Sequence, residues 1–225
     1  MLFRSGPDLR KRIAATGIPV RALSLHEPDA LEAAGWSEML EAAQSGVWSF
    51  TGGALRISPT PAMTLIDVDG HLEPAALALT AATAAGQALR AFGIAGSVGI
   101  DFPTLGGKDV RTAVATAFDA ALPAPFERTA VNGFGFMQVI RPRARASLID
   151  HLQSDPDGQA ARALLRRVER EGRTGTTTLV AHPRVIAVLE RHPAWLERLG
   201  RHLGGAIGLR RDAATPMSGG YAEPA

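Results

Sequence analysis

Two carboxylates, Asp67 and Asp101, stand in short apolar runs that are typical of β-strands. The runs are Ala-Met-Thr-Leu-Ile-Asp-Val-Asp-Gly over 62–70 and Gly-Ser-Val-Gly-Ile-Asp-Phe over 96–102. A buried, ionised carboxylate costs free energy unless a cation or a partner compensates it, and neither run contains a basic residue. Carboxylates from two strands suit a hard cation such as Mg²⁺, which indicates metal-assisted attack on a phosphodiester.

Asp69 is the third acidic residue of this group. Because residues i and i+2 of a strand share a face, Asp67 and Asp69 are expected to lie on the same side. A purely structural interpretation stays open beside the metal site. In that interpretation Asp69 forms an Asp-Gly turn with Gly70, and Asp101 caps the segment that follows it.

Hydrophobic periodicity and the positions of Gly and Pro predict the elements that carry these carboxylates. In chain order they are a hairpin (47–50 and 54–58), a strand ending at Gly70, a helix (73–92), a strand (96–101), a helix (108–122) and a strand (129–140). This alternation predicts an α/β fold with a βαβ-type arrangement. In open α/β sheets, ligands bind where the strands end.

The texture of the sequence predicts several regions. They are an N-terminal segment (1–42), a core (43–153), a small α/β domain (154–212) with a linker at 154–158, and a disordered tail (213–225). The N-terminal segment is a candidate remnant of an upstream domain. Met1–Ser5 is typical of a translated sequencing adapter, so we expect the natural chain to begin further upstream.

Composition excludes several classes of protein. With 225 residues, 46% of them hydrophobic, the chain can bury a sizeable core, and the absence of cysteine excludes disulfides and thiolate zinc sites. No 18-residue apolar run is present, so we expect no membrane span and a cytoplasmic location. All but two of the 24 basic residues are arginine, which suits phosphate groups, but a net charge of +2 does not by itself argue for nucleic acid.

Other motifs carry less chemistry. Gly93, Gly96 and Gly99 close a helix and enter a strand, which is the wrong order for a phosphate-binding loop. His-Pro pairs at 182–183 and 192–193 are explained as helix starts, and no Gly-x-Ser-x-Gly elbow is present. The arginines over 141–145 form a basic cluster, which is either a solvated strand end or an RNA phosphate contact.

Three segments in order carry a family resemblance. They are Ser-Phe-Thr-Gly-Gly (49–53) followed by Pro-Thr-Pro-Ala-Met-Thr-Leu-Ile-Asp-Val-Asp-Gly (59–70), Leu-Arg … Ile-Ala-Gly … Ile-Asp-Phe (89–102), and Phe-Gly-Phe-Met-Gln-Val-Ile-Arg-Pro-Arg (134–143). Together they resemble the catalytic core of the ribonuclease E/ribonuclease G family, in a short, cysteine-free and potentially fragmentary form. The resemblance covers about residues 47–145, and 182–211 is similar to the small domain that follows in the family.

The resemblance implies a deoxyribonuclease-I-like mixed sheet with flanking helices, followed by a small α/β domain. It also implies a Mg²⁺-dependent endoribonuclease in which Asp67 and Asp101 are the catalytic, metal-holding residues. Asp69 stands where the family has asparagine. In the family this residue orients the first aspartate; aspartate keeps the acceptor capacity but loses the amide donor and adds charge, so Asp69 is expected either to repel a nearby carboxylate or to act as an additional metal ligand.

The chain departs from the family pattern at several positions. Apolar or small residues near Ala78, Thr80 and Ala84 replace the family's Asn and Glu on the intervening helix, and Thr104 replaces an Asp. The family's Cys-Pro-x-Cys zinc link is absent, so no zinc is expected and any homo-oligomer would form without it. The family's OB-fold RNA-binding domain and its 5′-monophosphate pocket would lie upstream of this chain.

The sequence therefore predicts a Mg²⁺-dependent endoribonuclease of RNA processing or decay, which cleaves single-stranded RNA to 5′-phosphate and 3′-hydroxyl ends. Arg141, Arg143 and Lys108 are expected to hold the RNA backbone. One alternative is a catalytically impaired RNA-binding module of the same family. A further alternative is a structural partner of another nuclease, which would bind neither RNA nor Mg²⁺.

Overall fold

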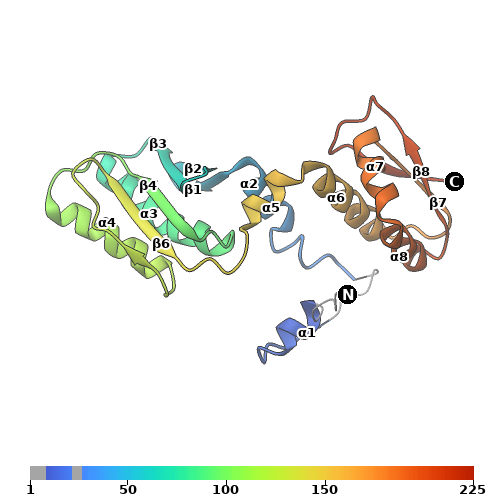
Figure 1. The fold of residues 1–225 in the computed structure, drawn as a ribbon, viewed down its shortest axis with the longest axis horizontal. Helices are drawn as coiled ribbons and strands as arrows, with labels where there is room; N and C mark the ends of the chain where they lie inside the picture. The colour runs from blue at the N-terminus through green and yellow to red at the C-terminus, as the bar shows by residue number, and fades with distance from the viewer. Residues whose placement is uncertain (1–8, 22–26) are drawn as a thin grey trace. The chain divides into compact units, whose positions relative to one another are not determined.

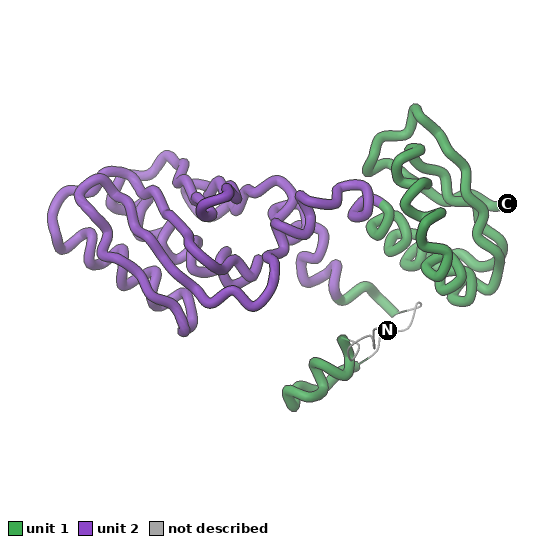
Figure 2. Tube along the Cα trace, viewed as in Figure 1, with its two compact units in different colours: residues 1–30, 161–225 green, residues 31–160 purple. Residues whose placement is uncertain are grey.

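The structure is a computed structural model that describes residues 9–21 and 27–225; the expectation about Met1–Ser5 therefore lies outside the described residues. Contacts divide the chain into a larger unit, residues 31–160, and a smaller unit, residues 161–225 with 1–30 (Figure 2). This division differs from the predicted one. The expected N-terminal segment 1–42 is divided between the two units, because helix α2 (Trp36–Ser45) packs Met39, Leu40 and Ala42 against the core of the larger unit.

The larger unit is built on a six-stranded mixed sheet (Figure 1). Its strands are β1 (Val47–Phe50), β2 (Gly53–Pro59), β3 (Thr64–Gly70), β4 (Gly96–Asp101), β5 (Glu127–Arg128) and β6 (Phe136–Arg141), in the order β1-β2-β3-β4-β6-β5. Strands β3 and β4 are parallel, and every other neighbouring pair is antiparallel. The predicted α/β class, a mixed sheet with flanking helices, is confirmed.

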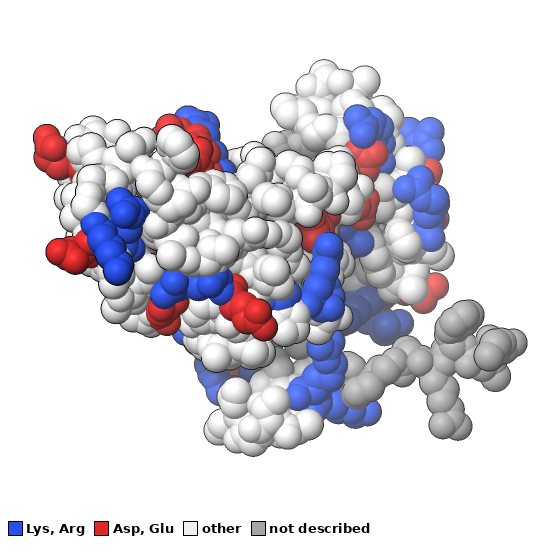
Figure 3. Space-filling view, turned by 60° about the vertical axis from the view of Figure 1, so that its left-hand side comes forward, with Lys and Arg blue, Asp and Glu red and all other residues white. Residues whose placement is uncertain are grey.

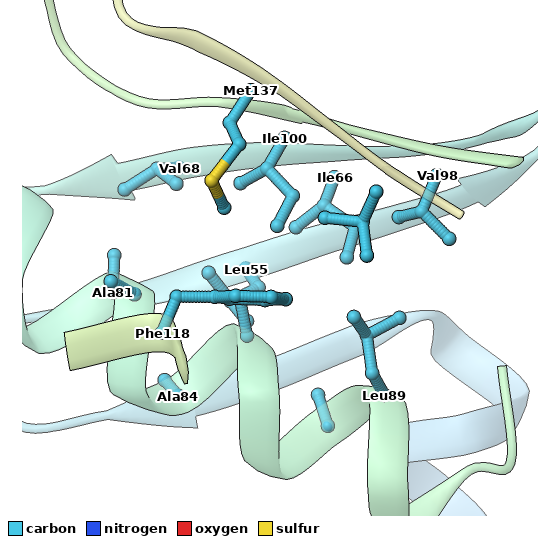
Figure 4. Packing of buried hydrophobic residues seen from close by; sticks show 14 of the residues in the cluster. Leu55, Ile66, Val68, Ala81, Ala84, Leu89, Val98, Ile100, Phe118 and Met137 are labelled. Atoms are coloured by element: carbon cyan, nitrogen blue, oxygen red, sulfur yellow. The ribbon is translucent and has the colours of Figure 1, made fainter. Parts of the chain in front are cut away.

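Helices α3 (Pro74–Ala91) and α4 (Lys108–Ala121) cover one face of this sheet. Figure 4 shows apolar side chains from the strands meeting Phe118 and Leu89 from the two helices. The helices approach closely because Gly86 has no side chain: a Cβ there would lie 2.7 Å from the Cβ of Ala121. Burial of this continuous apolar layer is the main source of stability for the larger unit.

The opposite side of the sheet, here called the open face, is not covered by a helix of residues 31–160. Strand β3 shows why the sequence leads to this arrangement, because its buried residues Ile66 and Val68 alternate with the exposed residues Leu65, Asp67 and Asp69. Leu65 remains 41% exposed and Ile140, on β6, 53% exposed. The open face therefore mixes acidic and apolar side chains.

Three expectations differ from the structure. Of the strand predicted over 129–140, only the part from Phe136 on is strand, in β6. Asn132 to Gly135 form a turn that separates β6 from β5, which ends at Arg128, before the predicted range. The expected linker is helical from Pro156, where helix α6 (Pro156–Arg170) begins, since proline is well tolerated in a first helical turn. The tail from 213, expected to be disordered, ends in strand β9 (Tyr221–Pro224), which buries Ala222 against strand β7 (Thr177–Ala181).

The smaller unit contains a three-stranded sheet in the order β8-β7-β9, with β8 formed by Ile207–Arg211. Helices α7 (Pro183–Arg191) and α8 (Pro193–Leu203) connect β7 to the parallel strand β8. The arginine-rich helix α6 precedes β7, and helix α1 (Leu9–Ala14) belongs to the N-terminal part of the unit. None of the helices in residues 9–21 and 27–225 combines the length and the apolar character needed to cross a membrane.

Candidate functional site

Asp67 and Asp101 lie side by side on the open face. They are register partners of the parallel strands β3 and β4, so their Cα atoms are separated by about one strand spacing, roughly 4.8 Å. Register partners on parallel strands also point to the same side of a sheet. The sheet therefore brings together two carboxylates that are 34 positions apart in the sequence.

The apolar runs suggest that both carboxylates would be buried at a cost in free energy, but the structure places them at the surface. Ile66, Ile100 and Val68 face the helices and are buried, whereas Asp67 and Asp101 face the opposite way and are exposed. Their charges therefore stay in contact with solvent and need no buried partner. What remains unfavourable is the repulsion between two like charges in register.

Asp69 is held by a basic residue that the sequence interpretation overlooked. The Arg56 Nε donates a hydrogen bond to the Asp69 Oδ2 across the β2–β3 pair. This hydrogen bond and the charge of Asp69 raise the pKa of Arg56 above its ordinary value, and Asp67 adds to the effect. The alternation of buried Leu55 and Ile57 was the signal that could have placed Arg56 on the open face beside these carboxylates.

A flat apolar floor adjoins the two aspartates. Gly99 lies on the open face of β4, and a Cβ at this position would lie 2.6 Å from the Cζ of Phe136 and 3.1 Å from the Cδ2 of Leu65. The absence of a side chain at Gly99 thus lets the Phe136 ring lie against the sheet. Phe136 is also the register partner of Asp101, so its ring adjoins the carboxylate pair.

The residues expected to hold RNA do not gather at these carboxylates. Arg141 pairs in register with Gly96, at the end of β4 opposite Asp101, about 16 Å away along the strand. Its Nη1 donates hydrogen bonds to the carbonyl oxygens of Leu89 (3.1 Å) and Ile94 (2.7 Å), and burial lowers its pKa. The contacts of Arg141 are therefore structural: its guanidinium donates to carbonyl groups at the end of helix α3.

Arg143 and Lys108 lie in different surroundings. The Arg143 Nη2 donates to the Asp150 Oδ2 at 3.0 Å, beside the start of helix α5 (Leu148–Ser154). Lys108 is exposed and begins helix α4, which follows the end of β4 where Asp101 lies. Of the three basic residues predicted from the sequence, Lys108 is the one placed after that end of the strand.

The two aspartates fit a magnesium ion as a minimal ligand pair. Across residues 9–21 and 27–225, no group of three or more His, Cys, Asp or Glu side chains is arranged to hold a metal ion. Mg²⁺ is usually bound through one or two protein carboxylates together with waters and substrate phosphates, so a pair of exposed aspartates in register could hold it. Asp69 is paired with Arg56, which leaves its carboxylate less available as a third ligand.

Two of the positions that depart from the pattern quoted above, Ala78 and Ala84, face the core beneath the sheet, whereas Thr80 and Thr104 are exposed. Ala78 and Ala84 of helix α3 are buried in the core, where an ionised side chain would be costly. The Thr80 hydroxyl donates to carbonyl groups within its own helix. The apolar residues at these positions thus serve packing beneath the sheet, and the open face receives its charges from the strands.

Comparison of the chain with protein-family models and with curated proteins found no match.

Proposed function

We propose that the larger unit is the catalytic core of a Mg²⁺-dependent endoribonuclease of the ribonuclease E/ribonuclease G type, with a deoxyribonuclease-I-like sheet. The observation that carries the proposal is the in-register pair of exposed aspartates, Asp67 and Asp101, on a sheet face that no helix of residues 31–160 covers. Its substrate is single-stranded RNA, because a strand without a partner can lie against an open sheet face with its bases unpaired.

In this mechanism Asp67 and Asp101 hold the ion. A bound Mg²⁺ supplies positive charge that stabilises the scissile phosphate and lowers the pKa of a water. Arg56, which pairs with Asp69 and is the register partner of Asp67, reduces the negative charge that an incoming phosphate meets. Lys108 contacts a neighbouring phosphate. Water attacks the phosphorus, the P–O3′ bond breaks and the 3′-oxygen leaves with a proton, so the products carry a 5′-phosphate and a 3′-hydroxyl.

The test is cleavage of a 5′-labelled single-stranded RNA in Mg²⁺ or in EDTA. We expect Asp67→Asn and Asp101→Asn each to reduce the rate by a factor of about 100 or more, since each removes one of two charged ligands. Asp119→Asn is the matched control. Asp119 lies on helix α4, away from the open face, and its carboxylate pairs with Arg128 of strand β5. The cleavage rate of this variant should stay within about twofold of that of wild type.

A second substrate identifies the nucleophile. An RNA with a 2′-deoxyribose at the scissile position cannot be cleaved by its own 2′-hydroxyl, but water can still attack it. We expect this RNA to be cleaved at a similar rate, with a 3′-hydroxyl at the new end. Equal rates for wild type, Asp67→Asn and Asp101→Asn would exclude the proposal.

The alternative function is an RNA-binding module without turnover. The observation that favours it is that no group of three or more His, Cys, Asp or Glu side chains in the described residues is arranged to hold a metal ion. In that case wild type binds the labelled RNA with salt-dependent affinity but yields no Mg²⁺-dependent product, and the two Asp→Asn variants bind equally well or better.

A further inference from the structure

Phe134 is exposed to an unusual extent for an aromatic residue. Its side chain is 83% exposed, more than any other large apolar side chain that the structure describes. Single exposed apolar residues are common on protein surfaces, so exposure alone carries no function. The position and the rigidity of this residue are what distinguish it.

The turn that carries Phe134 is fixed by its own hydrogen bonds. The Asn132 Oδ1 accepts from the backbone N–H groups of Phe134 (2.9 Å) and Phe136 (3.0 Å). Gly135 has φ +94°, and a Cβ there would lie 2.2 Å from the Phe102 carbonyl oxygen, so only glycine fits. The backbone that carries the Phe134 side chain is therefore held in place before any ligand binds, which lowers the entropic cost of stacking a base on the ring.

This turn lies at the end of the sheet where the aspartates meet. The Phe102 N–H donates to the Gly135 carbonyl oxygen at 3.2 Å, directly after Asp101. Phe136, the register partner of Asp101, places its ring over Gly99 on the open face. Phe136 thus adjoins Asp101 on the open face, and Phe134 is exposed on a turn at the same end of the sheet.

The charge of the larger unit indicates that RNA would be bound at this end of the sheet through its bases rather than through its phosphates. Residues 31–160 contain 8 Lys and Arg against 13 Asp and Glu, a net charge of −5, so long-range electrostatics of this unit disfavour an RNA backbone. Stacking of a base on an aromatic ring does not require positive charge and accepts any base. Open sheet faces with exposed aromatic residues are a recurrent surface for single-stranded RNA.

We infer that Phe134 and Phe136 form an aromatic platform on which bases of single-stranded RNA stack, next to the phosphodiester held at Asp67 and Asp101. The inference rests on the proposed function, because it places the bases relative to that phosphodiester. It deepens that function by defining the grip on the substrate as stacking of unpaired bases without a preferred sequence. Phe134 is the residue to test, since its exposure means that truncation leaves the core intact.

The experiment measures binding of fluorescein-labelled 12-nucleotide RNAs by anisotropy in EDTA, with one abasic ribose placed in turn at each position. We expect Phe134→Ala to weaken binding of the intact RNA roughly 5- to 150-fold. The same substitution should have little effect on RNAs that are abasic at one or two adjacent positions. Phe134→Trp should retain full affinity, whereas Phe134→Leu, which keeps apolar bulk without a π-face, should bind as poorly as Phe134→Ala.

Leu79→Ala is the control, because Leu79 is a partly exposed apolar residue on helix α3, away from the open face, and should bind RNA as wild type does. Cleavage of the same intact RNA in Mg²⁺ is recorded separately, so that the two proposals can fail independently. A wild type that cleaves while Phe134→Ala binds within twofold of it overturns the platform alone. A protein that loses affinity for the intact RNA, but not for the abasic RNAs, on Phe134→Ala, and that does not cleave, overturns the nuclease proposal alone. Full affinity for Phe134→Leu also overturns stacking, because simple apolar contact would then explain the binding.

Discussion

The two units of this chain carry opposite charge. Residues 31–160, with the open sheet face, have a net charge of −5, whereas the smaller unit, residues 1–30 and 161–225, holds 16 Lys and Arg against 9 acidic residues, a net charge of +7. On the face drawn in Figure 3, acidic and basic side chains lie next to one another among wide uncharged areas. The whole-chain value of +2 therefore conceals a segregation of charge along the sequence.

This difference bears on how a nuclease could divide its tasks. A site that holds a cation needs carboxylates, and the same carboxylates repel the phosphates of the substrate. In the proposed nuclease, positive charge on a second unit would attract the RNA backbone without neutralising the two aspartates proposed to hold the ion. Several arginines of the smaller unit are committed to ion pairs, such as Arg210 with Glu223 and Arg211 with Glu190. Others, including Arg191, Arg198 and Arg201 on α7 and α8, are exposed.

The largest effect is expected from a cavity in the core of the larger unit. Phe118 is fully buried and packs edge-to-face on Phe126, so Phe118→Ala should destabilise the larger unit by about 3–5 kcal/mol. Because the core cluster of the larger unit contains only residues between 43 and 152, backbone amides in 161–225 should keep their protection. Hydrogen exchange measured on peptides from both units checks this.

The control for this experiment is Leu79→Ala, which truncates a partly exposed residue of helix α3 and should change exchange little. Equal loss of protection in both units after Phe118→Ala would show that they unfold together. The comparison between two separately folded regions would then fail.

The second effect concerns RNA affinity. Changing Arg191, Arg198 and Arg201 together to glutamine should reduce the slope of log K against log salt by about 2 and weaken binding by up to about 100-fold at 0.1 M salt. Titration of labelled single-stranded RNA at several salt concentrations measures both quantities. All three side chains are exposed, so the melting temperature should stay unchanged.

The matched variant removes three exposed arginines of the larger unit: Arg90, Arg143 and Arg145. If backbone contacts follow the segregated charge, this triple variant should weaken binding less than the first. A larger loss than that of the first variant would favour the interpretation from the sequence, in which the cluster that includes Arg143 contacts RNA.

Local patterns in the sequence were sufficient for most elements of the larger unit. Alternation around Leu55 and Ile57 predicts strand β2, and the alanine-rich segment predicts helix α3 within a residue or two of its bounds. The break between β5 and β6 was missed because Phe134 and Phe136 read as strand residues. The Asn132 side chain and Gly135, which form the turn, outweigh that local preference.

The candidate site depends on information that a single strand does not contain. A carboxylate within each of two strand-like runs predicted a metal site, but the register of Asp67 and Asp101 across β3 and β4 is set by pairing between distant segments. Arg141 illustrates the same limit. In sequence it belongs to a basic cluster, whereas in the fold it donates to carbonyl groups of Leu89 and Ile94, 52 and 47 positions earlier.

A smaller effect is expected at the start of helix α5. The Ser147 hydroxyl and the Asp150 carboxylate form a capping box, and Arg143 adds an ion pair. Burial raises the pKa of Asp150, but hydrogen bonds from Ser147 and the charge of Arg143 outweigh it and leave the pKa below the ordinary value of 3.8. Asp150→Asn should therefore cost about 1 kcal/mol at neutral pH.

The sign of the pH dependence follows from the direction of this shift. A carboxylate with a lowered pKa stabilises the folded state above its ordinary pKa, and this contribution is lost as the pH falls through the lowered value. The difference in unfolding free energy between wild type and Asp150→Asn should thus be constant above pH 5 and shrink below 3.8. Urea unfolding at a series of pH values measures it. A difference that grows on acidification would contradict the assigned role.

The smallest effect is an increase in stability. Asp67 and Asp101 are like charges in register, so in EDTA Asp101→Asn should raise the free energy of unfolding of the larger unit by about 0.2–1 kcal/mol, or about 1–4 °C in melting temperature. Millimolar Mg²⁺ should raise the melting temperature of wild type but not that of the variant, because only the wild type retains both ligands. Glu41→Gln, an exposed position on helix α2, should respond to Mg²⁺ as wild type does. If Asp101→Asn instead melts at a lower temperature in EDTA, the carboxylates do not repel one another, and the acidic pair would have to be explained by a structural contact rather than by a place for a cation.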